Sequence, residues 1–398
     1  MLSSIAKGKS VIRNFSTGTD CISTMNMFKQ LGVEINYLEE KTLEVFGGKL
    51  NKSIENLNAG NSGTTMRLVS GILAGQEFSS TIIGDESLSK RPMQRIIDPL
   101  IKMGAEIKSN NGRAPLFIRG SHLHGIAYYP DLSSAQVKSC VLLAGINPTT
   151  SGMTVYNEKF CSRNHTELML EYLGANIKYN KNEVTVFPSE LLARDIEIVG
   201  DISSAAFLIV AGLIIEGSDF VIKNVGINET RAGILDVVQR MNGDIEVFNE
   251  RIISGEKVAD IRVRYSEELC GCEIFGKDIP RLIDELPIIA VLASQAEGET
   301  IVKDACDLRN KEADRIVCLV NELKKIGVEI EELPDGFIVR GKKNLLGEAE
   351  LEAYHDHRLA MSFYVAGLIC EKEISINGFE WVNISFPEFE SLIEELKM

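Results

Sequence analysis

The sequence lacks a long apolar run, an excess of basic residues and a basic N-terminal leader. No apolar stretch among its 398 residues reaches the roughly 20 residues that span a bilayer, and Met1–Ala6 contains no positive charge. These absences predict a cytoplasmic protein that does not bind a membrane. The net charge of −15 argues against nucleic acid as a partner, because phosphate backbones attract basic surfaces.

Metal-ligating side chains also lack the spacing that a metal site needs. The eight cysteines are scattered, and Cys270 and Cys272 stand too close together for a zinc knuckle. The alternation His355-Asp356-His357 suits a tight turn before a helix better than chelation. We therefore expect free thiols, no metal and no cofactor.

What the sequence does contain is an internal repeat. Five segments, each a helix end followed by a short strand, recur roughly every 70 residues. They are Leu31–Ile35, Met103–Ile107, Leu173–Ile177, Met241–Ile245 and Ile326–Ile330. Each has Gly or Asn at its helix end, where a left-handed backbone is needed.

The period predicts an α/β protein of five full repeats and a shortened sixth. The second repeat shows the expected order: helix Thr64–Leu73, strand Ser80–Ile83, loop Ser87–Pro92, helix Met93–Met103 and strand Ala105–Lys108. Three repeats in each half predict two domains, residues 1–199 and 200–398, with the break near Val199–Asp201.

Polar residues open many of the apolar helices. In Gly60–Arg67, small and hydroxylated residues lead into a helix with an arginine one turn in, which is typical of an anion site. Taken alone, it is equally well interpreted as an ordinary N-cap. Similar openings recur at Asp131–Gln136, Gly200–Ala205, Ile283–Pro287 and His355–Arg358.

Charged segments occupy one place in several repeats, ahead of the second helix. They are Gly84–Met93, Ser162–Glu167 and Leu308–Arg315. Any one of them is best explained as a solvated helix start with local ion pairs. Their recurrence at corresponding places favours a shared binding function.

Six segments together resemble the 5-enolpyruvylshikimate-3-phosphate synthase family. They are Asn61–Arg67, Gly84-Asp85 with Leu88 and Arg91–Met93, Ser134–Ser139, Ser162–Glu167, Lys311–Arg315 and Asp356–Met361, in the family's order over nearly the whole chain. The resemblance implies two domains, each of three βαβαββ units, with helix N-termini facing an interdomain cleft.

The resemblance also implies a reaction of aromatic amino acid biosynthesis. The enolpyruvyl group of phosphoenolpyruvate moves to the 5-hydroxyl of shikimate 3-phosphate, and phosphate is released. By this similarity Asp284 accepts the hydroxyl proton and Glu312 protonates the methylene carbon. The expected phosphoenolpyruvate ligands are Gly63, Arg91, Gln136, Arg315 and Arg358. The expected shikimate 3-phosphate ligands are Ser134, Gln136, Ser162, Arg163, Asp284 and Lys311.

The chain departs from the family pattern at its start. Family members have a strand and a Pro-Gly-x-Lys-Ser segment before the run that is Leu2–Gly8 here. From this difference we expect a truncated first repeat, a sixth repeat that lacks a strand and has an exposed sheet edge, and little activity. Ile384 stands where some members carry a lysine.

Two other functions remain open on the sequence. The sister transferase acts on UDP-N-acetylglucosamine and normally has a cysteine in the loop that corresponds to Ser87–Pro92, which contains none. The other alternative is a ligand-binding module without catalysis. We expect a monomer in either case.

Overall fold

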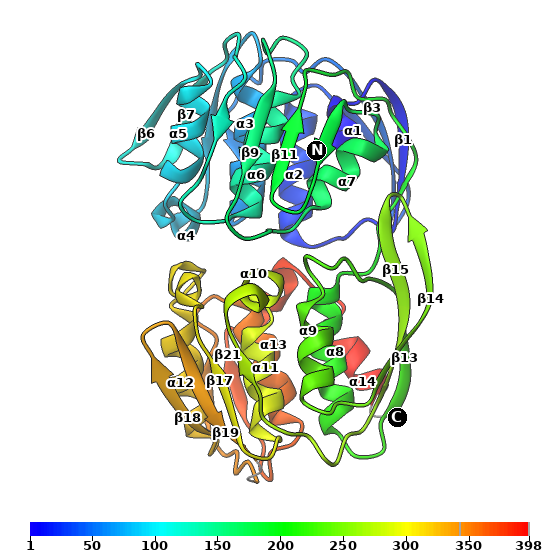
Figure 1. Cartoon of the computed structure of the whole chain (residues 1–398), viewed down its shortest axis with the longest axis vertical. Coiled ribbons are helices and arrows are strands. Elements are labelled where there is room, and N and C mark those ends of the chain that lie inside the picture. The colour runs from blue at the N-terminus through cyan, green and yellow to red at the C-terminus, as the bar shows by residue number, and fades with distance from the viewer. Residues whose placement is uncertain (342–343, 397–398) are drawn as a thin grey trace. The chain divides into compact units, whose positions relative to one another are not determined.

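A computed structural model describes residues 1–341 and 344–396 of the chain. It divides into two compact units, Met1–Ile198 and Val199–Met398, coloured blue to green and green to red in Figure 1. The division falls one residue before the boundary expected from the sequence. Each unit contains its own cluster of buried apolar side chains.

Three repeats build the first unit. The first comprises α1 (Leu2–Ile5), β1 (Gly8–Arg13), α2 (Thr19–Gln30), β2 (Glu34–Glu39), β3 (Thr42–Gly47) and β4 (Leu57–Asn58). The second comprises α3 (Gly63–Ala74), β5 (Ser79–Ile83), α4 (Glu86–Lys90), α5 (Gln94–Lys102), β6 (Glu106–Asn110), β7 (Arg113–Arg119) and β8 (Ala127–Tyr128). The third comprises α6 (Ala135–Gly145), β9 (Thr154–Asn157), α7 (His165–Tyr172), β10 (Ile177–Tyr179), β11 (Glu183–Val186) and β12 (Ile196–Glu197).

The second unit follows the same order. Its first repeat comprises α8 (Ile202–Ile214), β13 (Asp219–Gly226), α9 (Gly233–Arg240), β14 (Ile245–Ile253), β15 (Glu256–Arg264) and β16 (Glu273–Ile274). Next come the 3-10 helix Gly276–Asp278, α10 (Ile279–Leu282), α11 (Leu286–Ser294), β17 (Glu299–Val302), the 3-10 helix Cys306–Asn310, α12 (Arg315–Lys325), β18 (Glu329–Leu333), β19 (Gly336–Arg340) and β20 (Glu350–Glu352). The last elements are α13 (His357–Gly367), β21 (Ser375–Asn377), the 3-10 helix Phe379–Ile384 and α14 (Phe389–Leu396).

The sheets show the repeat as a common strand order. In the first unit the orders are β12-β1-β3-β2, β4-β5-β7-β6 and β10-β11-β9-β8. In the second they are β13-β15-β14, β16-β17-β19-β18 and β20-β21. A two-residue strand pairs in parallel with the first long strand of each four-stranded sheet, and the other pairs in these sheets are antiparallel. The sheet of the last repeat is the parallel pair of β20 and β21.

The first helix of most repeats is apolar around nearly its whole circumference. Every residue of α11 is buried, as is every residue of α8 except Ser204. A helix of this kind has no face for water and must lie inside the unit, covered by other elements. Figure 1 shows α8, α11 and α13 within the second unit, where they pack against one another, and α3 packs on α6 in the first. In the described part of the chain, no helix is long and apolar enough to cross a membrane.

The five helix ends that mark the repeat adopt the backbone expected from the sequence. The φ angles are +85° at Gly32, +100° at Gly104, +84° at Gly174, +61° at Asn242 and +96° at Gly327. These left-handed residues end the helices α2, α5, α7, α9 and α12 and turn the chain into the next strand. The prediction of a repeated helix cap is confirmed.

One expected loop is instead partly helical. The sequence predicts a loop at Ser87–Pro92, but Glu86–Lys90 forms the short helix α4. Asp85 begins it, since its carboxylate accepts a hydrogen bond from the amide of Leu88 at 2.7 Å. Pro92, which the sequence predicts to be in the loop, directly follows Arg91, the residue at which α4 ends.

The helix cap at Gly174 gives a direct test of the repeat. A Cβ atom there meets nothing within 4 Å, so Gly174→Ala changes only backbone strain. We expect a loss of about 1 kcal/mol and a melting temperature lower by roughly 2–4 °C in thermal unfolding followed by circular dichroism. Gly174→Asn is the control and should lose less, because Asn242 occupies the same place two helices later. Equal losses in the two variants would contradict this explanation.

Candidate active site

The start of α3 is held by its own side chains. The hydroxyl of Ser62 accepts a hydrogen bond from the Thr65 amide at 3.2 Å, and the Thr65 hydroxyl lies 2.6 Å from that of Thr24 on α2. The N-cap interpretation of this segment is therefore correct for Ser62. The anion-binding interpretation depends on the side chains that surround the cap.

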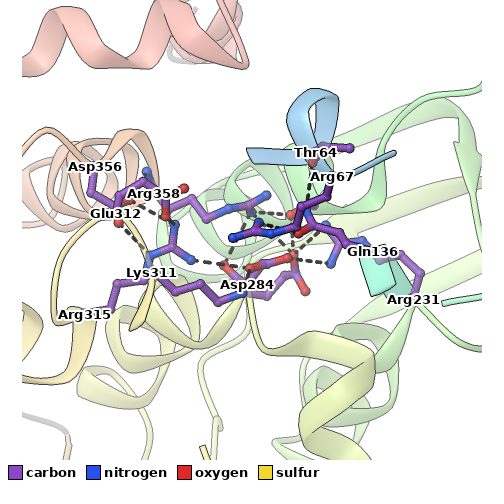
Figure 2. Close-up of polar contacts among 12 residues, drawn as sticks. Thr64, Arg67, Gln136, Arg231, Asp284, Lys311, Glu312, Arg315, Asp356 and Arg358 are labelled. Atoms are coloured by element: carbon purple, nitrogen blue, oxygen red, sulfur yellow. Dashed lines mark hydrogen bonds and ion pairs between the residues drawn. The ribbon is translucent and has the colours of Figure 1, made fainter. Parts of the chain in front are cut away.

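Gln136 joins the first turns of α3 and α6. Its amide oxygen accepts a hydrogen bond from Arg67 Nη1 at 2.6 Å, and its Nε2 donates to Thr64 Oγ1 at 2.8 Å, as Figure 2 shows. Gly63 lies beside this bridge, where a Cβ atom would meet Arg67 Nη1 at 2.8 Å and Arg91 Nη1 at 3.4 Å. Two guanidinium groups can therefore approach the α3 backbone because residue 63 has no side chain.

Arg91 is oriented by the loop that follows Gly60. Its Nη2 donates to Asn61 Oδ1 at 2.8 Å, and Asn61 in turn donates to Asp85 Oδ2 at 2.7 Å. Asp85 is also the cap of α4, so the helix that the sequence did not predict helps to orient Arg91. Gly63, Arg91 and Gln136, three of the expected phosphoenolpyruvate ligands, thus gather around the start of α3.

The expected shikimate 3-phosphate ligands of the first unit lie near the start of α6. Ser134 directly precedes this helix, and Arg163 is partly exposed in the segment between β9 and α7. Ser162 is only 4% exposed, and its hydroxyl donates to Glu158 at 2.7 Å. The hydroxyl of Ser162 is thus already bonded to a carboxylate within the protein.

In the second unit, three helix starts meet. Arg358 on α13 directs Nη1 to the hydroxyl of Ser203 on α8 and to the backbone carbonyl of Asp284 before α11, the latter at 3.4 Å. The Ser203 hydroxyl also donates to Glu285, which is fully buried. The side chain of Arg358 is 15% exposed. A cation that can reach a ligand is therefore fixed at the junction of three helices.

Asp284 is surrounded by cations. Lys311 Nζ lies 3.1 Å from Oδ1, Arg315 Nη1 lies 3.4 Å from Oδ1, and Arg231 Nη1 lies 3.2 Å from Oδ2. Asp284 is 8% exposed, which limits the water that can screen these charges. Figure 2 shows this cluster with the side chains directed toward one another.

Arg315 connects Asp284 with the other catalytic candidate. It is 1% exposed, and its Nη2 donates to Glu312 at 2.7 Å while its Nε donates to Asp356 at 2.7 Å. Burial alone would lower the pKa of Arg315, but Asp356, Glu312 and Asp284 outweigh it and raise that pKa. Asp284, Glu312 and Lys311 are thus brought together around a guanidinium that stays charged.

Acidic caps occupy two helix starts of this cluster. Asp201 accepts from the amide of Ser203 at 3.0 Å, and Asp356 accepts from the amide of Arg358 at 2.9 Å. Each carboxylate neutralises the positive end of its helix dipole. At α8 and α13 the ordinary N-cap interpretation is the correct one, and arginine and lysine side chains supply the positive charge.

Arg231 lies outside the sequence motifs, and Glu285 lies in the opening Ile283–Pro287 but was assigned no role there. Arg231 Nη2 lies 3.4 Å from Glu285 Oε1, and both side chains are at most 7% exposed. Arg231 lies between β13 and α9, which is the place that the three charged segments occupy in other repeats. That correspondence could have identified Arg231 from the sequence. The opening that contains Glu285 did not indicate its role, because no sequence pattern distinguishes a buried carboxylate from an exposed one.

His355 and His357 flank the cap of α13. The φ angles of Tyr354 and His355 are +54° and +57°, so the expected tight turn is confirmed. Burial and the neighbouring charge of Arg358 lower the pKa of His357 from 6.5 to about 4. Across residues 1–341 and 344–396, no three His, Cys, Asp or Glu side chains are grouped to hold a metal ion.

The lowered pKa of His357 predicts a loss of stability in acid. Between pH 6.5 and about 4 the unfolded chain binds a proton that folded His357 does not, so the free energy of unfolding falls as the pH falls through this window. The contribution is at most about 3 kcal/mol. Urea unfolding across this range should show a smaller loss for His357→Gln than for the natural protein. Equal losses would show that His357 protonates normally when folded.

Comparisons with known proteins identify the family of this chain. The family model described as EPSP synthase (3-phosphoshikimate 1-carboxyvinyltransferase) matches residues 1–393. A 3-phosphoshikimate 1-carboxyvinyltransferase of Pelotomaculum thermopropionicum is 46% identical over 402 residues, covering 100% of this chain and 92% of the relative. One of Thermoanaerobacter sp. is 49% identical over 393 residues, covering 98% and 92%.

Solved structures give the same result. The EPSP synthase of Acinetobacter baumannii superposes with a TM-score of 0.89 at 40% identity, over 100% of this chain and 92% of that one. The enolpyruvyl transferase NikO of Streptomyces tendae has a TM-score of 0.80 at 16% identity, which shows a shared fold. On the match of residues 1–393 and these identities, the chain belongs to the EPSP synthase family.

Proposed function

We propose that this chain transfers the enolpyruvyl group of phosphoenolpyruvate to the 5-hydroxyl of shikimate 3-phosphate and releases phosphate. The observation that carries the proposal is the cluster around Asp284. A carboxylate held by Lys311, Arg315 and Arg231, with Glu312 on the same arginine, offers a base, an acid and positive charge together. Addition and elimination on an anionic substrate need these groups.

Phosphoenolpyruvate binds the arginines Arg91, Arg315 and Arg358. One nitrogen of each guanidinium group is hydrogen-bonded within the protein. Arg91 Nη2 donates to Asn61, and Arg358 Nη1 donates to Ser203. This fixes the plane of a group whose fork matches a carboxylate or phosphate. Gly63 keeps the α3 backbone open to the ligand, and Gln136 contacts both substrates.

Arg315 has a second task in this scheme. Its short contacts to Asp356 and Glu312 fix it before any ligand arrives, and the carboxylates share its charge. Binding of phosphoenolpyruvate competes with Glu312 for this guanidinium. Glu312, once released from Arg315, lies near the negative charge of the substrate, and this charge favours the protonated form of Glu312. Glu312 must be protonated to donate a proton to the methylene carbon.

Shikimate 3-phosphate binds Ser134, Gln136, Ser162, Arg163, Asp284 and Lys311. The 5-hydroxyl oxygen bonds to C2 of phosphoenolpyruvate, its proton passes to Asp284, and Glu312 protonates C3. In the second step the Glu312 carboxylate takes a proton back from C3 and the C2–C3 double bond forms again. The bond between C2 and the phosphate oxygen breaks, and phosphate leaves with its electron pair and takes the proton held by Asp284. Each unit holds only part of this set of residues.

Four expectations from the sequence stay predictions: the division into catalytic domains 1–199 and 200–398, the monomeric state, the cytoplasmic location and the absence of a nucleic-acid partner. Size-exclusion chromatography coupled to light scattering is the direct check of the monomer.

Replacing the proposed base tests the mechanism. Asp284→Asn keeps the size of the side chain and most of its hydrogen bonds but cannot accept the proton, so we expect phosphate release to fall by about 10²–10⁴-fold. Calorimetry should show binding of shikimate 3-phosphate within a few fold of the natural protein. Asp236→Asn, which removes an exposed carboxylate paired with Arg281, is the control and should keep full activity. Normal turnover by Asp284→Asn would exclude it as the base.

Ligand-induced stabilisation separates this function from that of the sister transferase. A ligand that binds only the folded state raises the melting temperature in proportion to the logarithm of its concentration over its dissociation constant. Shikimate 3-phosphate should raise the melting temperature of this protein, and UDP-N-acetylglucosamine should not. The opposite result would assign the chain to the sugar nucleotide. Binding of shikimate 3-phosphate without phosphate release would favour the non-catalytic module.

A further inference from the structure

A buried cluster of three charged residues lies beneath the expected shikimate 3-phosphate ligands of the first unit. Lys138 Nζ lies 2.7 Å from Glu167 Oε1 and 2.9 Å from Glu158 Oε1. The three side chains are each 2% exposed. We call Lys138, Glu158 and Glu167 the buried triad. Its members come from α6, from the segment after β9, and from α7.

The buried triad contacts each polar group of Ser162. The Ser162 amide donates to Glu158 Oε1 at 2.8 Å, and its hydroxyl donates to Glu158 Oε2 at 2.7 Å. Its carbonyl accepts from Lys138 Nζ at 3.2 Å. The backbone and the side chain of Ser162 are therefore both fixed by two charged groups. The backbone position from which the side chain of Arg163, the next residue, extends is therefore also restricted.

The same triad ties this segment to α6. Lys138 lies one turn after Ser134 and two residues after Gln136 on that helix. Two further contacts strengthen the connection: Ser139 Oγ lies 2.6 Å from Thr166 Oγ1, and the Phe160 amide donates to Ser133 Oγ at 3.0 Å. Residues before, at and after Ser162 are thus fixed relative to the start of α6.

Glu158 itself has a fixed backbone. Its amide donates to the carbonyl of Asn182 at 2.9 Å, and its carbonyl accepts from Asn182 Nδ2 at 3.0 Å. A carboxylate that is anchored at its own main chain and clamped by Lys138 has little freedom to rotate. It can therefore impose one orientation on the Ser162 hydroxyl.

Stability alone does not account for so much buried charge. Removing ions from water costs several kcal/mol each, and apolar residues of the same volume often give an equally stable or more stable protein. Here one ammonium group faces two carboxylates. Burial alone would lower the pKa of Lys138, but Glu167 and Glu158 raise it, so Lys138 stays charged. Burial raises the pKa of Glu167, and this effect exceeds the lowering of that pKa by the positive charge of Lys138.

We propose that Glu158, held in place by Lys138, is a positioning residue that sets Ser162 and Arg163 in register with Ser134 and Gln136 for binding of shikimate 3-phosphate. Glu158 acts through Ser162 and does not touch the substrate. This role rests on the proposed binding of shikimate 3-phosphate by Ser162 and Arg163. Glu167 balances the charge of Lys138 and has no contact with Ser162 among the described interactions of the chain.

The triad contains a matched pair of test variants. Glu158→Gln and Glu167→Gln each neutralise a buried carboxylate that touches Lys138, but Glu158 alone contacts Ser162. We expect Glu158→Gln to raise the dissociation constant and the KM for shikimate 3-phosphate at least tenfold, the size of effect that a lost charged hydrogen bond produces. Glu167→Gln should change both by less than threefold. The KM for phosphoenolpyruvate should stay within threefold in both variants.

Melting temperatures separate positioning from general damage. If the two variants lose similar stability and weaken shikimate 3-phosphate binding equally, the triad is only structural and the proposal is overturned. Glu158→Asp provides a second test should Glu158→Gln fail to fold. It keeps the charge, but its shorter side chain cannot span Lys138 and Ser162, so the same selective rise in KM is expected. An unchanged KM in a folded Glu158→Asp protein also contradicts the proposal.

Failure of this inference differs from failure of the proposed function. If the natural protein releases no phosphate from the two substrates and does not bind shikimate 3-phosphate in calorimetry, the function is wrong. If the natural protein is active and Glu158→Gln binds shikimate 3-phosphate as tightly as it does, only the positioning role is wrong.

Discussion

The central constraint in this protein is that a charge removed from water must meet an opposite charge. Arg315, 1% exposed, is matched by Asp284, Glu312 and Asp356. The proposed base and the proposed acid are therefore oriented by a guanidinium before any substrate binds. The cost of leaving any one of them unpaired fixes the geometry of the others.

The repeat explains why these charges gather. Apolar helices that are buried on all sides must pack together, as α8, α11 and α13 do, and their starts then lie close to one another. The contacts of Arg358 with Ser203 and with the Asp284 carbonyl join these three starts. Residues that are 74 or more positions apart in the chain come together because the same unit is repeated.

The first unit applies the constraint in another way. Its expected ligands Gln136 and Arg91, both partly exposed, are oriented by Thr64 and Arg67 and by Asn61, which is bonded to Asp85. Its charged cluster, the buried triad, contacts Ser162. In the second unit charged side chains surround the proposed base Asp284, whereas in the first the buried triad fixes the segment that carries Ser162.

Local patterns were sufficient to predict the elements. The caps at Gly32, Gly104, Gly174, Asn242 and Gly327 are visible in the sequence because a left-handed backbone selects Gly or Asn wherever it occurs. The helix predicted at Thr64–Leu73 spans Gly63–Ala74, within one residue at each end. The error at Ser87–Pro92 arose because a five-residue helix has too few apolar positions to show a period.

The sequence by itself determined the repeat, the α/β class, the family and the residue types that the reaction needs. Only the tertiary structure decided which charges are partners. Glu285 and Lys138 lie in predicted segments but were assigned no role there, and Arg231 and Glu158 lie outside those segments. Their roles depend on contacts between residues as many as 82 positions apart. The physical reason is that a helix cap is set by a few neighbouring residues, whereas the pairing of buried charges is set by which elements pack together.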